Sequence, residues 1–412
     1  MNAIGIIAEY NPFHNGHLYH LTEAKKRSAA DACVCIISGN FTQRGEAAIL
    51  DKWQRARLAV SCGADLVLEL PFVFSVRSAE AFAWGGVSIL SGIPDVKALA
   101  FGSECTNLPL LKTAAALSFK EEFRHHLRNE LKAGHSYAAG VSSALACLSG
   151  TDEQLFKEPN TILSIEYLKA LKKTGSCLQP VPIERKTAQH SDAAIVSPIA
   201  SANAVRKELF SAGRSEQLLQ QALPEAVFTA LCRAYPLPDT LPSVTWLFSA
   251  LRLQLLHLSR NDLQEITGIS EGLEHALFHA ARTSENMPDF LRQIKSRRYP
   301  QSRLQRLLLA VLLRFSKADA RSFDASGPLY ARVLAANSRG CQILKNMKKS
   351  AAFPVITKTA QYISSDIMEQ KIFTPLQKML AYDIQAADLY SLCFRQIRPA
   401  NQDFLTSPWI DS

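Results

Sequence analysis

Apolar residues in the first half of the chain fall into short runs separated by longer segments of mixed polarity. The runs are rich in Ile, Val, Leu and Ala, and they predict strands over residues 3–10, 32–40, 64–71 and 96–104. The intervening segments predict helices over residues 18–29, 51–63 and 78–93. Strands that alternate with single helices are typical of a parallel sheet with right-handed crossovers. We therefore expect an α/β protein whose N-terminal part is a three-layer α/β/α domain.

The pattern changes after the fourth predicted strand. Residues 107–175 are mostly helical in character, residues 178–186 predict one more strand, and residues 201–213 predict one more helix. Beyond residue 215 apolar positions recur at helical spacing, and the one short strand that we expect there lies within residues 353–358.

Length and charge support a division into two regions. A chain of 412 residues exceeds the size at which a single hydrophobic core usually stops growing. We predict a catalytic α/β domain over residues 1–213 and a mainly helical region over residues 214–412. The net charge is +2 over residues 1–210 but +7 over residues 211–412. A basic second region is typical of a surface that binds a polyanion such as RNA, the alternative being ordinary solubilising charge.

Composition narrows the cellular setting. The chain is 47% hydrophobic and 20% charged, as in ordinary globular proteins. It has no apolar run of 18 residues and no signal peptide, so we expect no membrane association. Its nine cysteines are odd in number and irregularly spaced, which favours reduced thiols and a cytoplasmic protein.

The segments with the most chemical character follow the predicted strands. The first strand ends in "EYNPFHNGHLYH", the second in "SGNFTQRGE", the fourth in "FGSE" and the late strand in "IERK". In open parallel sheets, ligands bind beyond the carboxyl ends of the strands. Within "HNGH", His17 falls near a helix N-terminus, where backbone N–H groups favour phosphate. Two imidazoles there are suited to donate hydrogen bonds to the oxygens of a reacting polyphosphate.

Two other interpretations of "HNGH" remain open at this point. His14, His17 and His20 would form a metal site if the whole run were helical, but Pro12 and Gly16 disfavour such a helix, and we predict no metal site. The segment would otherwise be a structural turn with exposed histidines. The chain lacks both GxxxxGK[ST] and a GxGxxG after the first strand, which disfavours P-loop and dinucleotide-binding proteins.

"HNGH" resembles the HxGH motif of the nucleotidylyltransferase superfamily. "IASANAVR" at residues 199–206 is similar to the superfamily's ISSxxxR motif, with Ser201 and Arg206 in matching places and Ala200 in place of a serine. A fuller resemblance is to the bacterial tRNA(Met) cytidine acetate ligase family, and it covers essentially the whole length of the chain. It is carried by "HNGH" and by "SGNFTQRGEAAILDKWQRARLAVSCGADLVLELP", "AFGSE", "EPNTILSIEYLKAL" and "IERK".

The resemblance implies an ATP-dependent ligase. Members of this family activate acetate as acetyl-adenylate and acetylate N4 of the wobble cytidine of elongator tRNA(Met). The implied substrates are therefore ATP, acetate and this tRNA, and Mg²⁺ is expected with ATP. By motif match, the implied ATP contacts are Ile7, Ala8, Glu9, Tyr10, Asn11, Pro12, Phe13, His14, Asn15, Gly16, His17, Leu18, Tyr19, His20, Gly102, Asn160 and Arg185.

Catalytic roles follow from the chemistry of these residue types. We expect His14 and His17 to steady phosphate oxygens, and Arg44 in "TQRGE" to meet a carboxylate or an RNA phosphate. Glu46 is a further candidate in the same loop. Structural alternatives are a helix cap for Asn160, a turn for Gly102, a solvated position for Arg185 and a loop ion pair for Arg44.

The densest basic stretch of the second region spans residues 291–321. We expect the arginines at its start to bind RNA phosphates and an adjoining tyrosine to stack on a base. The candidate tRNA-binding residues are Arg297, Arg298, Tyr299, Arg303 and Arg306. A solvated helix face is the alternative.

Two other functions compete with the ligase. One is a nucleotidylyltransferase that adenylylates a small phosphorylated metabolite, and the other is a non-catalytic RNA-binding protein. The first has no need for a basic helical region, and the second gives no reason for polar motifs to gather at the strand ends.

Overall fold

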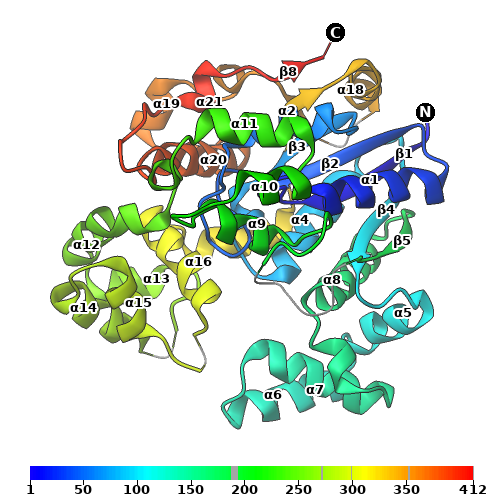
Figure 1. Ribbon diagram of the computed structural model, residues 1–412. Helices are drawn as coiled ribbons and strands as arrows, with labels where there is room; N and C mark the ends of the chain where they lie inside the picture. The colour runs from blue at the N-terminus through cyan, green and yellow to red at the C-terminus, as the bar shows by residue number, and fades with distance from the viewer. Residues whose placement is uncertain (187–193, 271, 298, 351–352, 412) are drawn as a thin grey trace.

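Figure 1 shows the computed structural model, which describes residues 1–186, 194–270, 272–297, 299–350 and 353–411. A sheet forms its centre, with the order β5-β4-β1-β2-β3-β6-β7 and β8 paired to β6. The strands are β1 (Ala3–Ala8), β2 (Ala32–Ser38), β3 (Leu66–Leu70), β4 (Val96–Ser103), β5 (Gln179–Glu184), β6 (Ala331–Ala336), β7 (Val355–Ile356) and β8 (Trp409–Ile410). β1 to β5 run parallel, as predicted, whereas β6 is antiparallel to β3.

Most of the remaining described chain is helical. The helices before β5 are α1 (Asn15–Ser28), α2 (Lys52–Ser61), α3 (Phe72–Ser75), α4 (Ala79–Ser91), α5 (Leu108–Leu117), α6 (Glu121–Lys132), α7 (Tyr137–Ser149), η1 (Glu153–Phe156) and α8 (Pro159–Thr174). Those between β5 and β6 are α9 (Ala202–Leu209), α10 (Glu216–Ala222), α11 (Glu225–Ala234), η2 (Pro238–Thr240), η3 (Val244–Leu247), α12 (Phe248–His257), α13 (Arg260–Glu265), α14 (Leu273–Thr283), α15 (Met287–Ile294), α16 (Gln301–Leu312) and α17 (Lys317–Ser326). The last are α18 (Ser338–Ser350), η4 (Thr359–Gln361), α19 (Ser365–Gln370), α20 (Pro375–Ser391) and α21 (Gln402–Leu405). None of the described helices is both long and apolar enough to cross a bilayer.

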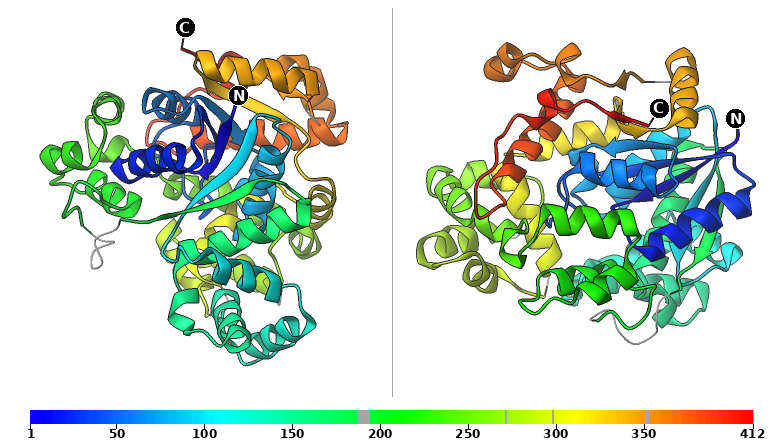
Figure 2. Two further views of the ribbon diagram at one scale, coloured as in Figure 1. Left: turned by 90° about the vertical axis from the view of Figure 1, so that its right-hand side faces the viewer. Right: turned by 45° about the horizontal axis from the view of Figure 1, so that its top comes forward.

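The order of the strands places a switch point between β1 and β4. From β1 the chain moves through β2 to β3 in one direction, and it then returns to add β4 and β5 on the other side of β1. Because such crossovers are right-handed, the helices before and after this reversal cover opposite faces of the sheet. Figure 2 shows α1 on one side, with α4 and α8 on the other. A crevice at the carboxyl ends of β1 and β4 is the expected ligand site.

The end of the chain returns to the sheet, which the sequence pattern did not predict. The predicted region 214–412 contributes β6, β7 and β8, and β6 extends the edge at β3. Only the short strand within residues 353–358 was expected, and it corresponds to β7. The helices from α12 to α16 form a separate group beside this sheet (Figure 1).

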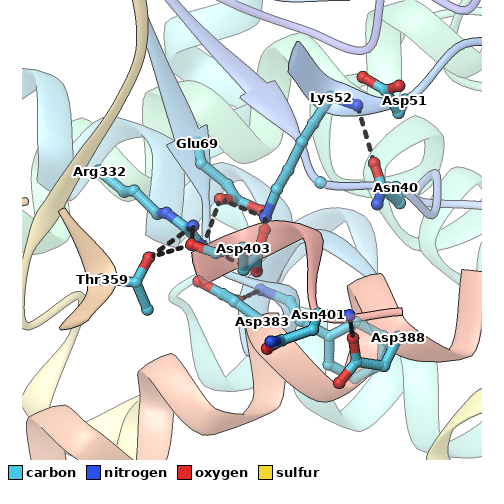
Figure 3. Close-up of polar contacts among 12 residues, drawn as sticks. Asn40, Asp51, Lys52, Glu69, Arg332, Thr359, Asp383, Asp388, Asn401 and Asp403 are labelled. Atoms are coloured by element: carbon cyan, nitrogen blue, oxygen red, sulfur yellow. Dashed lines mark hydrogen bonds and ion pairs between the residues drawn. The ribbon is translucent and has the colours of Figure 1, made fainter. Parts of the chain in front are cut away.

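A buried ionic cluster fastens this returning segment to the α/β core. Lys52 Nζ lies 2.8 Å from Glu69 Oε1 and 2.8 Å from Asp403 Oδ1. Arg332 Nη1 lies 2.9 Å from Asp403 Oδ2 and 3.3 Å from Glu69 Oε2, and its Nη2 donates to Thr359 Oγ1 at 3.0 Å. Figure 3 shows these side chains converging from α2, β3, β6, η4 and α21. Both cations and both carboxylates are almost completely buried, so each charge depends on its partners.

Candidate active site

The segment between β1 and α1 is built around two histidines that cap the helix. His14 is the N-cap, and its Nδ1 accepts a hydrogen bond from the Gly16 backbone N–H at 3.0 Å. His17 Nδ1 accepts in turn from the His14 backbone N–H at 3.3 Å. A Cβ at position 16 would lie 2.8 Å from His14 Cε1, so this arrangement requires glycine there. The "HNGH" spacing is therefore a capping box made of imidazoles.

This capping fixes the tautomers of both rings. Each Nδ1 accepts a hydrogen bond from a backbone N–H and therefore carries no hydrogen, so in the neutral imidazole the hydrogen is on Nε2. Burial, with the charges of Arg185 and Arg206, lowers the pKa of His14 to about 3. Burial, followed by the neighbouring His14, lowers the pKa of His17 well below its usual value. The ring centroids lie 3.8 Å apart, and no hydrogen-bond partner for either Nε2 occurs among the described residues. The pair thus offers two neutral donors, not two cations.

The third histidine joins the residues predicted from β4 and β5. A Cβ at Gly102 would lie 3.4 Å from Arg185 Cγ and 3.9 Å from His20 Cδ2, so these three residues are neighbours. Burial, and then the charge of Arg185, lowers the pKa of His20 to about 4. His20 Nε2 is buried without a hydrogen-bond partner within the described ranges. Buried polar atoms are usually satisfied, so this ring is poised for a ligand at the switch point.

Glu104 connects the remaining ATP candidates, and the sequence reasoning did not single it out. Its Oε1 accepts from Asn160 Nδ2 at 2.6 Å, and its Oε2 accepts from the Thr161 backbone N–H at 2.9 Å. Arg185 Nε lies 3.6 Å from Glu104 Oε1. Asn160 therefore does not cap α8, whose N-cap is Glu158, because Glu104 satisfies the first turn instead. The signal was the glutamate directly after Gly102-Ser103 at the end of β4.

Other residues of the predicted ATP segment serve packing. Tyr10 and Phe13 are buried, and Tyr10 Oη contacts Cys35 Sγ at 3.3 Å. Ile7 packs its side chain toward Gly86 of α4, so it can offer only backbone atoms to a ligand. Asn11 Oδ1 accepts from the Ile49 backbone N–H at 2.7 Å, and Asn11 Nδ2 is buried without a partner in the described part of the chain.

Two arginines, the buried Arg55 and the partly exposed Arg206, hold the strand ends together. Arg55, on α2, donates to the carbonyl of Glu9 at 2.6 Å, to that of Ser38 at 2.9 Å and to that of Leu50 at 3.0 Å. It thereby joins the ends of β1 and β2 to the loop that leads from β2 into α2. The sequence reasoning missed this role because Arg55 has the appearance of an ordinary polar position on an amphipathic helix.

The second of these arginines is Arg206, which matches the arginine of the ISSxxxR motif, and its contacts explain what this residue does in the fold. Its Nη1 donates to the Asn11 carbonyl at 3.0 Å, and its Nη2 lies 3.5 Å from Glu46 Oε2. Ser201 is the N-cap of α9 and accepts from the Ala204 backbone N–H. Arg206 therefore links the histidine segment to the loop that carries Arg44, which is exposed and has no ion-pair partner among the described residues.

The predicted RNA-binding stretch needs correction at Tyr299. Its ring is buried, and its Oη donates to the Ser270 carbonyl at 2.7 Å, so it is not available to stack on a base. Arg303 lies over the Tyr299 ring, 4.2 Å from the centroid. Arg297 is exposed, and Arg298 lies outside the described residues.

Arg306 also differs from the prediction of a solvent-facing arginine. Its Nη1 donates to the Gln43 carbonyl at 3.3 Å, and burial lowers its pKa to about 10. A Cβ at Gly45 would lie 2.6 Å from the Arg306 backbone nitrogen, so α16 packs directly on the turn that contains Arg44. The helical region thus supports the loop after β2.

Folding stability should fall in acid because His14 is buried as the neutral imidazole. An unfolded histidine binds a proton below about pH 6.5, whereas folded His14 does so only near pH 3. The free energy of unfolding is therefore unaffected by this group above about pH 6.5 and falls as the pH drops below that value. At pH 5, protonation of this residue in the unfolded chain lowers the free energy of unfolding by about 2 kcal/mol. We expect His14→Asn to reduce the loss of unfolding free energy between pH 7 and pH 5 by about that amount, measured by urea denaturation. Equal losses in both proteins would contradict a neutral His14. The comparison cancels Asp383, whose pKa burial raises to about 7 and which acts in the opposite direction.

Comparisons with known proteins agree with this geometry. A family model described as HIGH Nucleotidyl Transferase matches residues 1–403. The tRNA(Met) cytidine acetate ligase of Caldanaerobacter subterraneus subsp. tengcongensis is 38% identical over 409 residues, which cover 98% of each chain. The protein of the same description from Thermoanaerobacter sp. is 36% identical over 411 residues, again 98% of each chain. The crystal structure of Thermotoga maritima TmcAL bound with alpha-thio ATP is 30% identical, with a TM-score of 0.88 and complete coverage of both chains.

Proposed function

The chain belongs to the HIGH nucleotidyl transferase family and, within it, to the tRNA(Met) cytidine acetate ligases, and on this premise we propose that it is an ATP-dependent tRNA acetate ligase. In the first step, a carboxylate oxygen of acetate attacks the α-phosphorus of ATP. The bond from that phosphorus to its bridging oxygen breaks, and pyrophosphate leaves. In the second step, N4 of the wobble cytidine of elongator tRNA(Met) attacks the acetyl carbon. AMP leaves, and N4 loses one proton to solvent.

The observation that supports this function best is the pair of neutral imidazoles at the sheet's switch point. Phosphoryl chemistry of this kind needs positioning and stabilisation of charge on the phosphate oxygens. His14 and His17 would supply Nε2–H donors for these oxygens, already oriented by the helix cap. Because both rings are neutral, they would not serve as proton donors to the leaving pyrophosphate.

The remaining site residues fit the parts of the nucleotide and the carboxylate. We propose that His20, Gly102, Asn160 and Arg185 hold the nucleotide beside β4 and β5, with Glu104 fixing Asn160 and Arg185. We propose that Arg44 meets acetate or an RNA phosphate. No group of three His, Cys, Asp or Glu suited to a metal occurs among the described residues, so Mg²⁺ would enter with the ATP phosphates.

The proposed function is tested by incubating the purified protein with radiolabelled acetate and tRNA, with and without ATP. We expect ATP-dependent label that nuclease digestion releases as N4-acetylcytidine. Acetate-dependent ATP–pyrophosphate exchange without labelled tRNA would retain the first step and reject the acceptor. Absence of both signals would reject the ligase and favour adenylylation of a small phosphorylated metabolite.

A further inference from the structure

A cavity of about 630 Å³ lies between the catalytic loops and the helical region. One wall comes from the loop after β2, at Glu46, Ala47 and Ile49, and another from α9. The opposite wall comes from the segment around η3 and from α15 and α16. Parts of the chain that are far apart in sequence therefore enclose one space.

This cavity adjoins the candidate active site through shared side chains. Arg206 and Glu46 line it, and the same Arg206 donates to the Asn11 carbonyl beside His14. Arg206 would therefore lie between a ligand in the cavity and the reacting phosphate. ATP is predicted to occupy the other side, where Gly102, Arg185 and His20 meet.

The lining has the chemistry of a nucleobase pocket. Phe210 follows α9 with 47% of its surface exposed, and the partly exposed Leu291 and the nearly buried Ile49 and Met287 also line the cavity. Ser243 and Thr245 add hydroxyl groups. The volume falls within the usual 300–1,000 Å³ of small-molecule sites and far exceeds what acetate would fill. Sequence-specific RNA recognition usually takes unstacked bases of single-stranded loops onto aromatic rings.

The rim of the cavity carries the charge that the RNA backbone requires. Lys207 and Lys295 line the cavity, are exposed, and have no ion-pair partner among the described residues. Arg292 also lines it, although it pairs with Asp289 at 2.7 Å. Cations around an apolar aromatic wall are suited to hold phosphates on both sides of an inserted base.

We propose that this cavity receives the acceptor nucleobase of the RNA, unstacked from its neighbours, with Phe210 against the base and Lys207 and Lys295 on the flanking phosphates. The proposal rests on the proposed function and adds the place of the acceptor. It also assigns the role predicted for Tyr299 to Phe210, an aromatic residue that is exposed and lines the cavity.

The first test is Phe210→Ala, with Phe210→Tyr as the conservative variant. We expect Phe210→Ala to lower kcat/KM for tRNA acetylation by about 10- to 100-fold, in line with the loss of one base–aromatic stack. Acetate-dependent ATP–pyrophosphate exchange, which does not need RNA, should stay within about twofold, and Phe210→Tyr should restore most acetylation. The control is Phe119→Ala, because Phe119 is 39% exposed but does not line the cavity.

Three outcomes would overturn the assignment. Equal loss of exchange and acetylation in Phe210→Ala would place ATP or pyrophosphate in the cavity. Acetylation by Phe210→Ala that matches Phe119→Ala would show that no base stacks there. Wild-type protein without any ATP-dependent label in tRNA would reject the proposed function itself, a result distinct from either failure of the variants.

The rim is tested by the dependence of tRNA KM on salt. Each phosphate contact to a single strand contributes about 0.7 to the slope of log affinity against log salt. We expect Lys207→Ala combined with Lys295→Ala to lower this slope by about 1 to 1.5, with exchange unchanged. An unchanged slope would remove these lysines from the RNA path.

Discussion

His14→Asn should lose about 100- to 1,000-fold in acetate-dependent ATP–pyrophosphate exchange while keeping its helix cap. Asparagine is a good N-cap residue, and its side-chain oxygen can replace His14 Nδ1 as the acceptor for the Gly16 backbone N–H. It has no counterpart of the Nε2–H donor, whose loss typically costs about 2.7–4 kcal/mol of barrier. The measurement is the exchange rate at saturating ATP, together with the urea midpoint at pH 7.

His14→Ala and a distant histidine provide the comparison. His14→Ala removes the cap as well as the donor, so it should match the activity of His14→Asn but unfold at lower urea. His275→Asn changes an exposed histidine on α14 and should leave exchange and stability unaltered. Exchange by His14→Asn at the wild-type rate would show that His14 acts only as a cap.

Lys52→Met should destabilise the protein by about 3–5 kcal/mol, the usual cost of leaving buried carboxylates without a cation. Lys52 is only 1% exposed and contacts both Glu69 and Asp403, so its loss leaves Arg332 alone between two carboxylates (Figure 3). Methionine has nearly the same length, which keeps the change mainly electrostatic. The measurement is the shift of the urea midpoint at pH 7.

The control for this variant is an exposed ion pair of the same chemistry. Lys157 lies 3.2 Å from Glu153 at (i, i+4) spacing, and both side chains are more than two-fifths exposed. Lys157→Met should change stability by less than about 1 kcal/mol. If Lys52→Met behaved like Lys157→Met, the buried cluster would contribute little to holding the C-terminal segment on the sheet.

The α/β core was predictable because each of its elements is consistent with local rules. Nearly continuous apolar runs predicted β1 to β4, and the helix predicted over residues 51–63 corresponds to α2, which Asp51 caps. β6 was missed for two physical reasons. Its sequence "ARVLAA" contains three alanines, which are poor strand formers, and its buried Arg332 is stabilised by Asp403, a residue far along the chain.

The site was predictable where all the contacts that shape it lie within one short motif. "HNGH" is such a case, because the glycine and both cap acceptors lie within four residues. Glu104, Arg55 and the partners of Arg206 were not predictable in the same way, because their contacts join separate strands and helices. Tyr299 shows the opposite error, since a tyrosine among arginines favoured an RNA surface, yet its burial beside Ser270 is a tertiary property.

The late pairing of β6 with β3 has a consequence for synthesis on the ribosome. β3 ends at Leu70, but its edge partner begins at Ala331, so a nascent chain displays an open sheet edge through most of its translation. Lys52 and Glu69 likewise lack their partners Asp403 and Arg332 until those residues have been synthesised. Chains that terminate early would carry this edge permanently, ready to pair with other nascent chains. The final stretch of translation therefore covers the β3 edge and supplies the last two members of the buried ionic cluster.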